Sequence, residues 1–434
     1  MRLVVRGVAL LGASTADILI DEGVIREVGT VKAKADRVID GAGLIALPGL
    51  VDLHTHLREP GGEATETILS GSRAAAAGGF TAVHAMANTS PVADTAQRVE
   101  LVAELGRRAG FVEVRPVGAV THNLDGAQLA DIGEMARSAA AVTVFSDDGR
   151  CVGDALLMRR ALEYVSTFGG VIAQHAQDPR LTLDGVMHEG AVSSELGLRG
   201  WPSVAEESII ARDVLLAEYV GARLHVCHVS TAGSVDVIRW AKRRGIAVTA
   251  EVTPHHLLLT DDAARSYDTV FKVNPPLRTQ TDVDELRRAV ADGTIDIIAT
   301  DHAPHSAASK DATWQDAPFG MVGLESALSV VQATLVDTGA ISWNDVARIL
   351  SVTPAAIGRV SGYDSPLAVG SPANITLVDP AHRENWTVER VRGRSANTPF
   401  VGVPTAGRVM ATIFRGRETV VDGEVLDDEE MRTL

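Results

Sequence analysis

Short runs in which hydrophobic and polar residues alternate lie at both ends of the chain. These runs cover residues 3–8, 18–20, 24–28 and 37–39 near the N-terminus, and 375–378, 410–415 and 418–421 near the C-terminus. A period of two is typical of strands that bury one face. We therefore expect a small composite β-sandwich domain that is built from residues 1–47 and 366–434.

Between residues 48 and 365 the pattern changes to apolar runs that alternate with segments of helical periodicity. The apolar runs lie at residues 49–54, 80–86, 111–118, 141–145, 170–174, 222–227, 246–252 and 295–300. Helical periodicity is clearest at residues 69–77, 97–108, 205–219 and 235–243. Strands that alternate with helices pack as a parallel sheet. The α/β pattern predicts a closed (β/α)8 TIM-type barrel over residues 48–365, with a doubly wound open sheet as the alternative.

Side chains that bind metals recur at the ends of the predicted strands, where a barrel of this type carries its chemistry. They are His54 and His56 after the first strand, Asp147 and Asp148 after the fourth, His175 after the fifth, His228 after the sixth and Asp301 after the eighth. His54 and His56 are two positions apart, so on a strand both imidazoles point to one face. An aspartate after a strand is often only a helix cap. The recurrence of histidines and aspartates after five strands that end at the same rim nevertheless favours a metal centre.

This ligand set is too large for one metal ion. A single catalytic zinc takes three protein ligands, whereas the rim offers four imidazoles and, with Asp147 and Asp148 counted as alternatives, two carboxylates. Two metal ions that share a bridging carboxylate would use all of them and would lower the pKa of a bound water.

Composition and charge narrow the class of protein. The chain is 46% hydrophobic and 22% charged, with a net charge of −16, as in a soluble globular protein. The negative charge argues against nucleic acid and anionic membrane as partners. No apolar run reaches the ~18 residues of a membrane span, and no signal-peptide pattern follows Met1, so we expect a cytoplasmic protein.

The chain has two cysteines, Cys151 and Cys227, which form no disulfide framework. Because Cys227 alternates with His228, we expect its thiol to face the helices.

Two segments resemble the amidohydrolase superfamily, specifically the bacterial class I dihydroorotases. The first segment, residues 52–61, reads DLHTHLREPG, and the second, residues 299–305, reads ATDHAPH and is followed by Lys310. The resemblance covers essentially the whole chain. It implies the barrel with its composite β-sandwich, zinc, and the reversible cyclisation of N-carbamoyl-L-aspartate to L-dihydroorotate in de novo pyrimidine biosynthesis.

The resemblance also implies a ligand set. Many relatives bridge two metals with a carboxylated lysine after the fourth strand, but no lysine lies between Lys34 and Lys242. The class I dihydroorotases have an aspartate there, which by its spacing matches Asp148, with Asp147 as the alternative. We expect two Zn²⁺ per chain, bridged by Asp148. One ion would be held by His54, His56 and Asp301, and the other by His175 and His228.

The same resemblance assigns the remaining site residues. Substrate contacts are implied for His56, Arg58, Asn88, Asn274, His305, Phe319 and Gly320. Arg58 offers the fork geometry that a carboxylate prefers, whereas an asparagine taken alone is more often a turn residue. Asp301 would be both a ligand and the general acid–base catalyst. We interpret His255 and His256 as structural residues or as supports of the metal ligands, and His225, which lies inside a predicted strand, as a core residue.

Two other functions compete with this interpretation. A hydantoinase, dihydropyrimidinase or allantoinase would share the metal rim, but such enzymes usually have the bridging lysine and lack the counterpart of Arg58. A non-catalytic dihydroorotase-like scaffold for aspartate transcarbamoylase would have lost metal ligands, which this chain keeps. We expect a small-molecule substrate and a homo-oligomer, and association with aspartate transcarbamoylase stays open.

Overall fold

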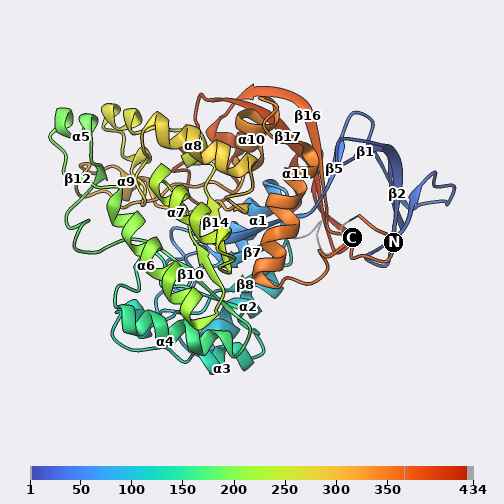
Figure 1. The fold of residues 1–434 in the computed structure, drawn as a ribbon. Helices are drawn as coiled ribbons and strands as arrows, with labels where there is room; N and C mark the ends of the chain where they lie inside the picture. The colour runs from blue at the N-terminus through green and yellow to red at the C-terminus, as the bar shows by residue number, and fades with distance from the viewer. Residues whose placement is uncertain (1, 366, 428–434) are drawn as a thin grey trace.

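The computed structural model describes residues 2–365 and 367–427. Within them, eight parallel strands form the central barrel (Figure 1). They are β6 (Leu50–Thr55), β7 (Phe80–Ala85), β8 (Glu113–Pro116), β9 (Val144–Phe145), β10 (Val171–Gln174), β13 (Leu224–Val226), β14 (Val248–Val252) and β15 (Ile297–Ile298). Each of the eight apolar runs predicted from the sequence overlaps one of these strands, and seven runs contain the whole strand, since β6 ends one residue beyond its run.

Two bridges close the strands into a ring. The ladders β6-β7-β8 and β9-β10-β13-β14-β15 are joined by a parallel bridge between Gly118 and Phe145. On the other side, Thr55 pairs with His302, and the backbone N–H of His56 donates to the His302 carbonyl at 2.8 Å. The parallel strands therefore form the expected (β/α)8 barrel and not an open sheet.

Helices cover the outside of the barrel (Figure 1). They are α1 (Ile68–Ala77), α2 (Ala96–Ala109), α3 (Ile132–Arg137), α4 (Ala155–Ser166), α6 (Val204–Val220), α7 (Ala232–Arg243), α8 (Gln280–Ala291), α10 (Ala327–Val331) and α11 (Trp343–Ala347). The helix α12 (Thr353–Gly358) instead lies at the amino ends of the strands, where Ile357 packs with side chains inside the barrel. Shorter elements, α5 (Ala191–Leu196), α9 (Ala307–Lys310), β11 (Met187–His188) and β12 (Gly200–Trp201), lie in the loops. Several helices begin at a side-chain cap, such as Thr67 for α1 and Thr279 for α8, which satisfies free N–H groups of the first turn.

Strands from both ends of the chain share one sheet. Its order is β19-β18-β17-β16-β5-β1-β2-β3, and β4 pairs with β1. The strands are β1 (Arg2–Leu10), β2 (Thr15–Asp21), β3 (Val24–Gly29), β4 (Arg37–Asp40), β5 (Ile45–Pro48), β16 (Ile375–Asn385), β17 (Pro404–Phe414), β18 (Arg417–Val421) and β19 (Glu424–Val425). The N-terminal and C-terminal parts meet where β5 runs antiparallel to β16. The division at residues 47/48 and 365/366 stays a prediction.

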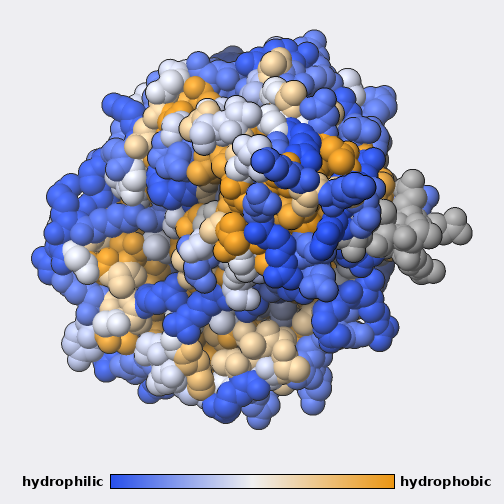
Figure 2. All heavy atoms as spheres, turned by 90° about the vertical axis from the view of Figure 1, so that its right-hand side faces the viewer, coloured by the Kyte–Doolittle hydropathy of each residue, from blue (hydrophilic) through white to orange (hydrophobic). Residues whose placement is uncertain are grey.

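The face of the molecule that Figure 2 shows is mostly hydrophilic. Figure 2 views the side of the terminal sheet, where apolar atoms form patches separated by hydrophilic side chains. Scattered apolar exposure of this kind is ordinary for folded proteins. Among the described residues, no helix is both long and apolar enough to cross a bilayer.

Candidate metal and substrate site

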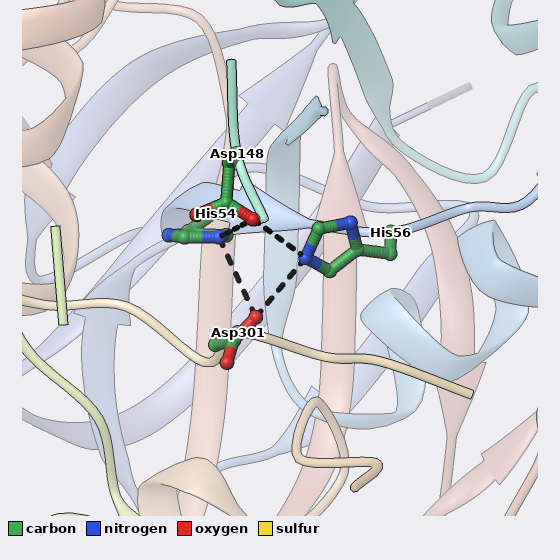
Figure 3. A group of neighbouring side chains, drawn as sticks. All are labelled: His54, His56, Asp148 and Asp301. Atoms are coloured by element: carbon green, nitrogen blue, oxygen red, sulfur yellow. Dashed lines mark hydrogen bonds and ion pairs between the residues drawn. The ribbon is translucent and has the colours of Figure 1, made fainter. Parts of the chain in front are cut away.

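Four side chains from three distant segments meet at the carboxyl end of the barrel. His54 and His56 come from β6 and the turn after it, Asp148 follows β9, and Asp301 follows β15 (Figure 3). The Nε2 atoms of His54 and His56 both lie 3.3 Å from Asp148 Oδ2, and they lie 3.4 and 3.1 Å from Asp301 Oδ1. All four side chains are buried. This first cluster has the composition of a metal site.

Asp148 belongs to a second cluster as well. Its other oxygen, Oδ1, lies 3.1 Å from both His175 Nδ1 and His228 Nε2. These two ring nitrogens are 2.9 Å apart. Asp148 thus presents one oxygen to each cluster, which is the arrangement that a bridging carboxylate requires.

The neighbouring Asp147 points elsewhere. Its carboxylate accepts hydrogen bonds from the backbone N–H of Val120 at 2.8 Å and of Thr121 at 2.9 Å, and also from the Thr121 hydroxyl. It therefore fixes the loop after β8. The structure favours Asp148 over Asp147 as the residue that faces the histidines.

The electrostatics of the two clusters suit divalent cations. Burial lowers the pKa of His54, but Asp148, Glu251 and Asp301 outweigh that effect and hold it well above its ordinary value. The same negative field favours a metal ion. Nε2 of His54 is also buried and has no hydrogen-bond partner among the described residues. Imidazoles with carboxylates are a donor set that zinc accepts.

Glu251, on β14, orients ligands of both clusters. Its Oε1 accepts from His54 Nδ1 at 2.6 Å and from the backbone N–H of His228 at 3.2 Å, while Oε2 lies 2.9 Å from His225 Nε2. Burial raises the Glu251 pKa, but the histidines outweigh it and leave the pKa lowered. A carboxylate behind a metal-binding histidine fixes its tautomer and ring orientation. Sequence reasoning did not assign Glu251, although a glutamate inside an apolar strand was a signal.

Two amide side chains orient the other histidines. His56 Nδ1 lies 2.9 Å from Asn88 Oδ1, and His175 Nε2 lies 2.7 Å from Gln177 Oε1. An amide oxygen only accepts, so these nitrogens carry the hydrogen. Nε2 of His56 and Nδ1 of His175 are left with lone pairs that face the clusters. Gln177 is a second residue that the sequence analysis missed.

Asp52 ties the first and last strands of the barrel beneath the site. Its carboxylate accepts from the backbone N–H of His54 at 3.0 Å, from that of Thr300 at 3.2 Å and from the Thr300 hydroxyl at 2.6 Å. Burial raises its pKa to about 6. This clamp holds the segments that carry His54 and Asp301 at a fixed separation.

A cavity of about 370 Å³ opens beside the metal-type clusters. It is lined by all seven residues for which substrate contacts were expected, which are His56, Arg58, Asn88, Asn274, His305, Phe319 and Gly320. Asp148, His175 and Asp301 line it too. The structure therefore brings the expected substrate residues to one pocket together with four of the six expected metal ligands, while His54 and His228 do not line it.

Arg58 supplies positive charge to this pocket. Its Nε donates to the Pro304 carbonyl at 3.2 Å, and an Nη atom lies 3.4 Å from His305 Nε2. Burial, Arg58 and Lys310 lower the pKa of His305 to about 3, so its imidazole is neutral. His305 Nε2 donates to the Phe319 carbonyl at 2.7 Å. The arginine thus carries the charge, and the histidine links it to the loop that contains Phe319.

Asn274 keeps one polar atom free for a ligand. Its Nδ2 donates to Gln177 Oε1 at 3.1 Å, which orients the amide. Its Oδ1 is buried and has no hydrogen-bond partner among the described residues. A buried acceptor without a partner is costly, so a donor on a bound ligand would satisfy it.

Two lysines shape the loop at residues 315–320. Lys272 Nζ donates to the carbonyls of Gln315 and Ala317 at 3.0 and 2.6 Å, and Lys310 Nζ donates to that of Pro318 at 2.9 Å. With these carbonyls held from behind, the backbone of the loop keeps a fixed position at the pocket.

The expected orientation of Cys227 is wrong. The thiol lies inside the barrel in a cluster with Leu53, Ala173 and Ile297, and its sulfur is within 4.8 Å of ligand atoms of His54 and Glu251. Strand β13 ends at Val226 and His228 has a φ of +31°, so strand alternation does not extend to His228. Burial raises the pKa of the Cys227 thiol, which makes it a poor ligand.

Sequence comparisons point to one family. The family described as "Dihydro-orotase-like" matches residues 43–234. Proteins named dihydroorotase from Leifsonia xyli subsp. xyli and Streptomyces coelicolor are 62% and 60% identical to this chain. Each alignment covers 98% of this chain, and 97% and 99% of the relative. The dihydroorotase of Mycobacterium tuberculosis is 53% identical over 98% of this chain and 100% of its own length.

Solved structures of the same fold are more distant in sequence. A dihydropyrimidinase from Brevibacillus agri superposes with a TM-score of 0.86 at 24% identity, covering 98% of this chain and 96% of that structure. An L-hydantoinase from Arthrobacter aurescens gives 0.86 at 24% identity, with coverage of 98% and 97%. These likenesses show that the chain shares the fold of those two structures. Because these three dihydroorotases are more than half identical to it over almost the whole length, the chain belongs to the dihydroorotase family of cyclic amidohydrolases.

Proposed function

We propose that the two clusters hold two zinc ions that serve the dihydroorotase reaction. This reaction is the reversible cyclisation of N-carbamoyl-L-aspartate to L-dihydroorotate and water in pyrimidine biosynthesis. The observation that carries the proposal is the position of Asp148, which presents one oxygen to each cluster at the edge of a pocket containing Arg58.

The donor sets divide naturally between the two ions. His54, His56 and Asp301 would hold one ion, His175 and His228 would hold the other, and Asp148 would be shared. When bound, such a pair of cations makes hydroxide available at neutral pH and polarises a carbonyl. The chain's own residues supply the rest of the chemistry.

The polar groups of the pocket would bind the substrate. The guanidinium of Arg58 would pair with the free carboxylate, which both substrate and product carry. The amide of Asn88, whose oxygen is taken by His56, still has N–H groups to donate. Asn274 Oδ1 is free to accept from a ring N–H. His305 and the backbone of Phe319 and Gly320 would complete the contacts.

Asp301 would move the proton. In hydrolysis it takes a proton from the attacking water as the new C–O bond forms, and passes it to the ring nitrogen as the C–N bond breaks. In cyclisation the reacting carboxyl group is in its protonated form, with that proton taken up from solution. Asp301 accepts the proton of the attacking ureido nitrogen as the C–N bond forms, and passes it to the hydroxyl of this carboxyl group, which leaves as water as the C–O bond breaks. Burial raises the pKa of Asp301, but His54 and His56 outweigh it and leave the pKa lowered. The base form is therefore available.

The alternatives fit the pocket less well. Hydantoinases and dihydropyrimidinases share the fold, but their cyclic substrates give Arg58 no carboxylate to bind. A scaffold that had lost its activity would not be expected to keep both ligand clusters intact. The charge of the pocket and its complete donor set favour the dihydroorotase reaction.

A comparison of the turnover of two substrates tests the proposal. The purified, zinc-loaded protein is assayed with L-dihydroorotate and with dihydrouracil, which lacks the carboxylate. We expect turnover of dihydroorotate to exceed that of dihydrouracil by about a hundredfold or more, because loss of a charged partner leaves Arg58 unpaired. Arg58→Gln should remove most of this preference. Equal or faster turnover of dihydrouracil by the unmodified chain would contradict the proposal.

We further propose a homo-oligomer in the cytoplasm, where pyrimidine synthesis would take place. Association with aspartate transcarbamoylase, whose product is the substrate here, stays open. The mass of the purified protein in solution, alone and mixed with the transcarbamoylase, tests both assembly states, and cell fractionation tests the location.

A further inference from the structure

Asn397 comes from the C-terminal part of the chain but binds the backbone of two segments at the barrel mouth. It lies between β16 and β17, and its side chain is buried. Its Oδ1 accepts from the His305 backbone N–H at 3.0 Å, and its Nδ2 donates to the carbonyls of Ala303 and Gly320 at 3.1 and 3.2 Å. One side chain therefore connects the segment after Asp301 with the loop of residues 315–320.

These two segments are packed so closely that their spacing matters. Gly320 has a φ of +132°, and a Cβ atom there would lie 2.8 Å from Ala303 Cβ and 2.9 Å from His305 Nε2. The His305 imidazole also reaches across to the Phe319 carbonyl. A small separation of the segments would move His305 and the loop backbone relative to each other.

We propose that Asn397 is a positioning residue for substrate binding. Through its hydrogen bonds it fixes His305 and the Phe319-Gly320 backbone at the spacing in which they contact the substrate, and the inference rests on the function proposed above. An amide suits the task because it both accepts from one segment and donates to the other. None of its three partners is a metal ligand, so the effect falls on substrate binding and not on the metal clusters.

The segment that carries Asn397 is anchored independently of it. Glu325 Oε1 accepts from the backbone N–H groups of Arg392 and Gly393 at 2.9 and 3.3 Å. The Ser395 hydroxyl donates to the Thr65 carbonyl at 2.8 Å. Removal of the Asn397 amide therefore takes away three hydrogen bonds to the two pocket segments while the segment that carries Asn397 stays in place. The pocket segments then keep the hydrogen bonds from His305 to the Phe319 carbonyl and from the Ala303 N–H to the Met321 carbonyl at 2.9 Å.

The test compares Asn397→Ala with Ser395→Ala, which removes a hydrogen bond from the same segment at a similarly buried position. For each zinc-loaded protein, KM and kcat for L-dihydroorotate and zinc content are measured. Hydrogen–deuterium exchange is followed in peptides that cover residues 303–305 and 316–322. For Asn397→Ala we expect KM to rise about tenfold or more, kcat to change less than about threefold, and exchange in both peptides to accelerate. Zinc content should match the unmodified protein, and Ser395→Ala should change KM less than about twofold.

Several results would overturn the inference. They are an unchanged KM in Asn397→Ala, a loss of kcat at unchanged KM, a loss of zinc, or an equal rise of KM in Ser395→Ala. If Asn397→Ala does not fold, Asn397→Asp, which keeps the acceptor and loses the donors, is judged by the same criteria. If the unmodified chain does not turn over dihydroorotate, the proposed function fails instead. The exchange rates then decide the positioning role alone, and unchanged exchange in both peptides refutes it.

Discussion

Asp148 and Asp301 are two buried carboxylates that meet the same histidines in different ways. Asp148 uses both oxygens, one for each cluster, and burial of its charge is outweighed by His54 and the other imidazoles, which hold its pKa well below the ordinary value. Asp301 meets His54 and His56 through Oδ1. The function proposed above uses Asp148 as a shared ligand and Asp301 for proton transfer, so it gives the two carboxylates separate tasks.

Replacement of Asp301 tests its proposed role in proton transfer. Asp301→Asn keeps the shape of the side chain but removes its basicity, so we expect turnover to fall below a tenth of the unmodified rate in both directions. Rates of dihydroorotate formation and hydrolysis check this, together with the metal content. A variant that retains more than about a tenth of the activity would refute the catalytic assignment.

A substitution of Glu251 tests whether this residue supports the proposed metal ligands His54 and His228. Glu251→Gln weakens the hydrogen bonds that orient His54 and His228, so we expect zinc affinity to fall about 10–100-fold. Competition with a chelator of known affinity measures the change. Glu418→Gln is the matched control, because Glu418 is also buried and paired, with Arg37, but lies in the terminal sheet. Equal zinc affinity in the two variants would contradict the role of Glu251.

The cysteines give a pH prediction. Burial raises the pKa of the Cys151 thiol to about 12 and also raises that of Cys227. The thiolate is the reactive form of cysteine, and pH 8 lies well below the pKa of both thiols. Both cysteines therefore stay protonated and unreactive. We expect mass spectrometry to find neither cysteine alkylated by iodoacetamide at pH 8 in the folded protein, and both alkylated in denaturant. Rapid modification of Cys227 in the folded protein would contradict its place inside the barrel.

At the scale of elements, apolar periodicity was enough to locate every barrel strand. It overestimated their length where strands run into functional turns. The run at residues 295–300 yields only β15 (Ile297–Ile298), because the N–H and hydroxyl of Thr300 bind the Asp52 side chain in place of a neighbouring strand. Side-chain chemistry thus replaces ladder pairing at the rim.

Backbone conformation at the rim explains the error at Cys227. Arg58, His228 and Asp301 have φ values of +54°, +31° and +48°. A residue in this region breaks the two-residue alternation on which the sequence argument depended. The type of residue at the rim could therefore be predicted, but the direction of each side chain could not.

The loop of residues 315–320 offers a test at the same scale. Gly320→Ala places a Cβ against Ala303 and His305 at a positive φ, which costs about 1–3 kcal/mol in strain or displaces the loop. We expect KM for dihydroorotate to rise and the melting temperature to fall. Gly153→Ala is the control, because a Cβ there meets only ordinary contacts with Pro179. Equal KM values for the two variants would contradict the tight packing at Gly320.

For the whole molecule, the closed barrel explains why ligands between positions 54 and 301 of the sequence form one site. Parallel strands end at the same rim, so the sequence could predict that His54, His175 and His228 converge. It could not pair Glu251 with His54 or Asn397 with His305, because these partners are 197 and 92 positions apart in the sequence. Gln177 lies only two positions from His175, and no motif marked it. The sheet shared by both termini brings Asn397 to the rim.

The metal content of active protein tests the central claim most directly. Metal per chain is measured on the same sample as dihydroorotate formation, before chelation, after it, and after zinc is restored, for the unmodified chain and for Asp148→Ala. We predict two zinc ions per chain, loss of activity on chelation and recovery with zinc, while Asp148→Ala loses both metal and turnover. Undiminished dihydroorotate formation by metal-free protein, or by Asp148→Ala, would contradict the account.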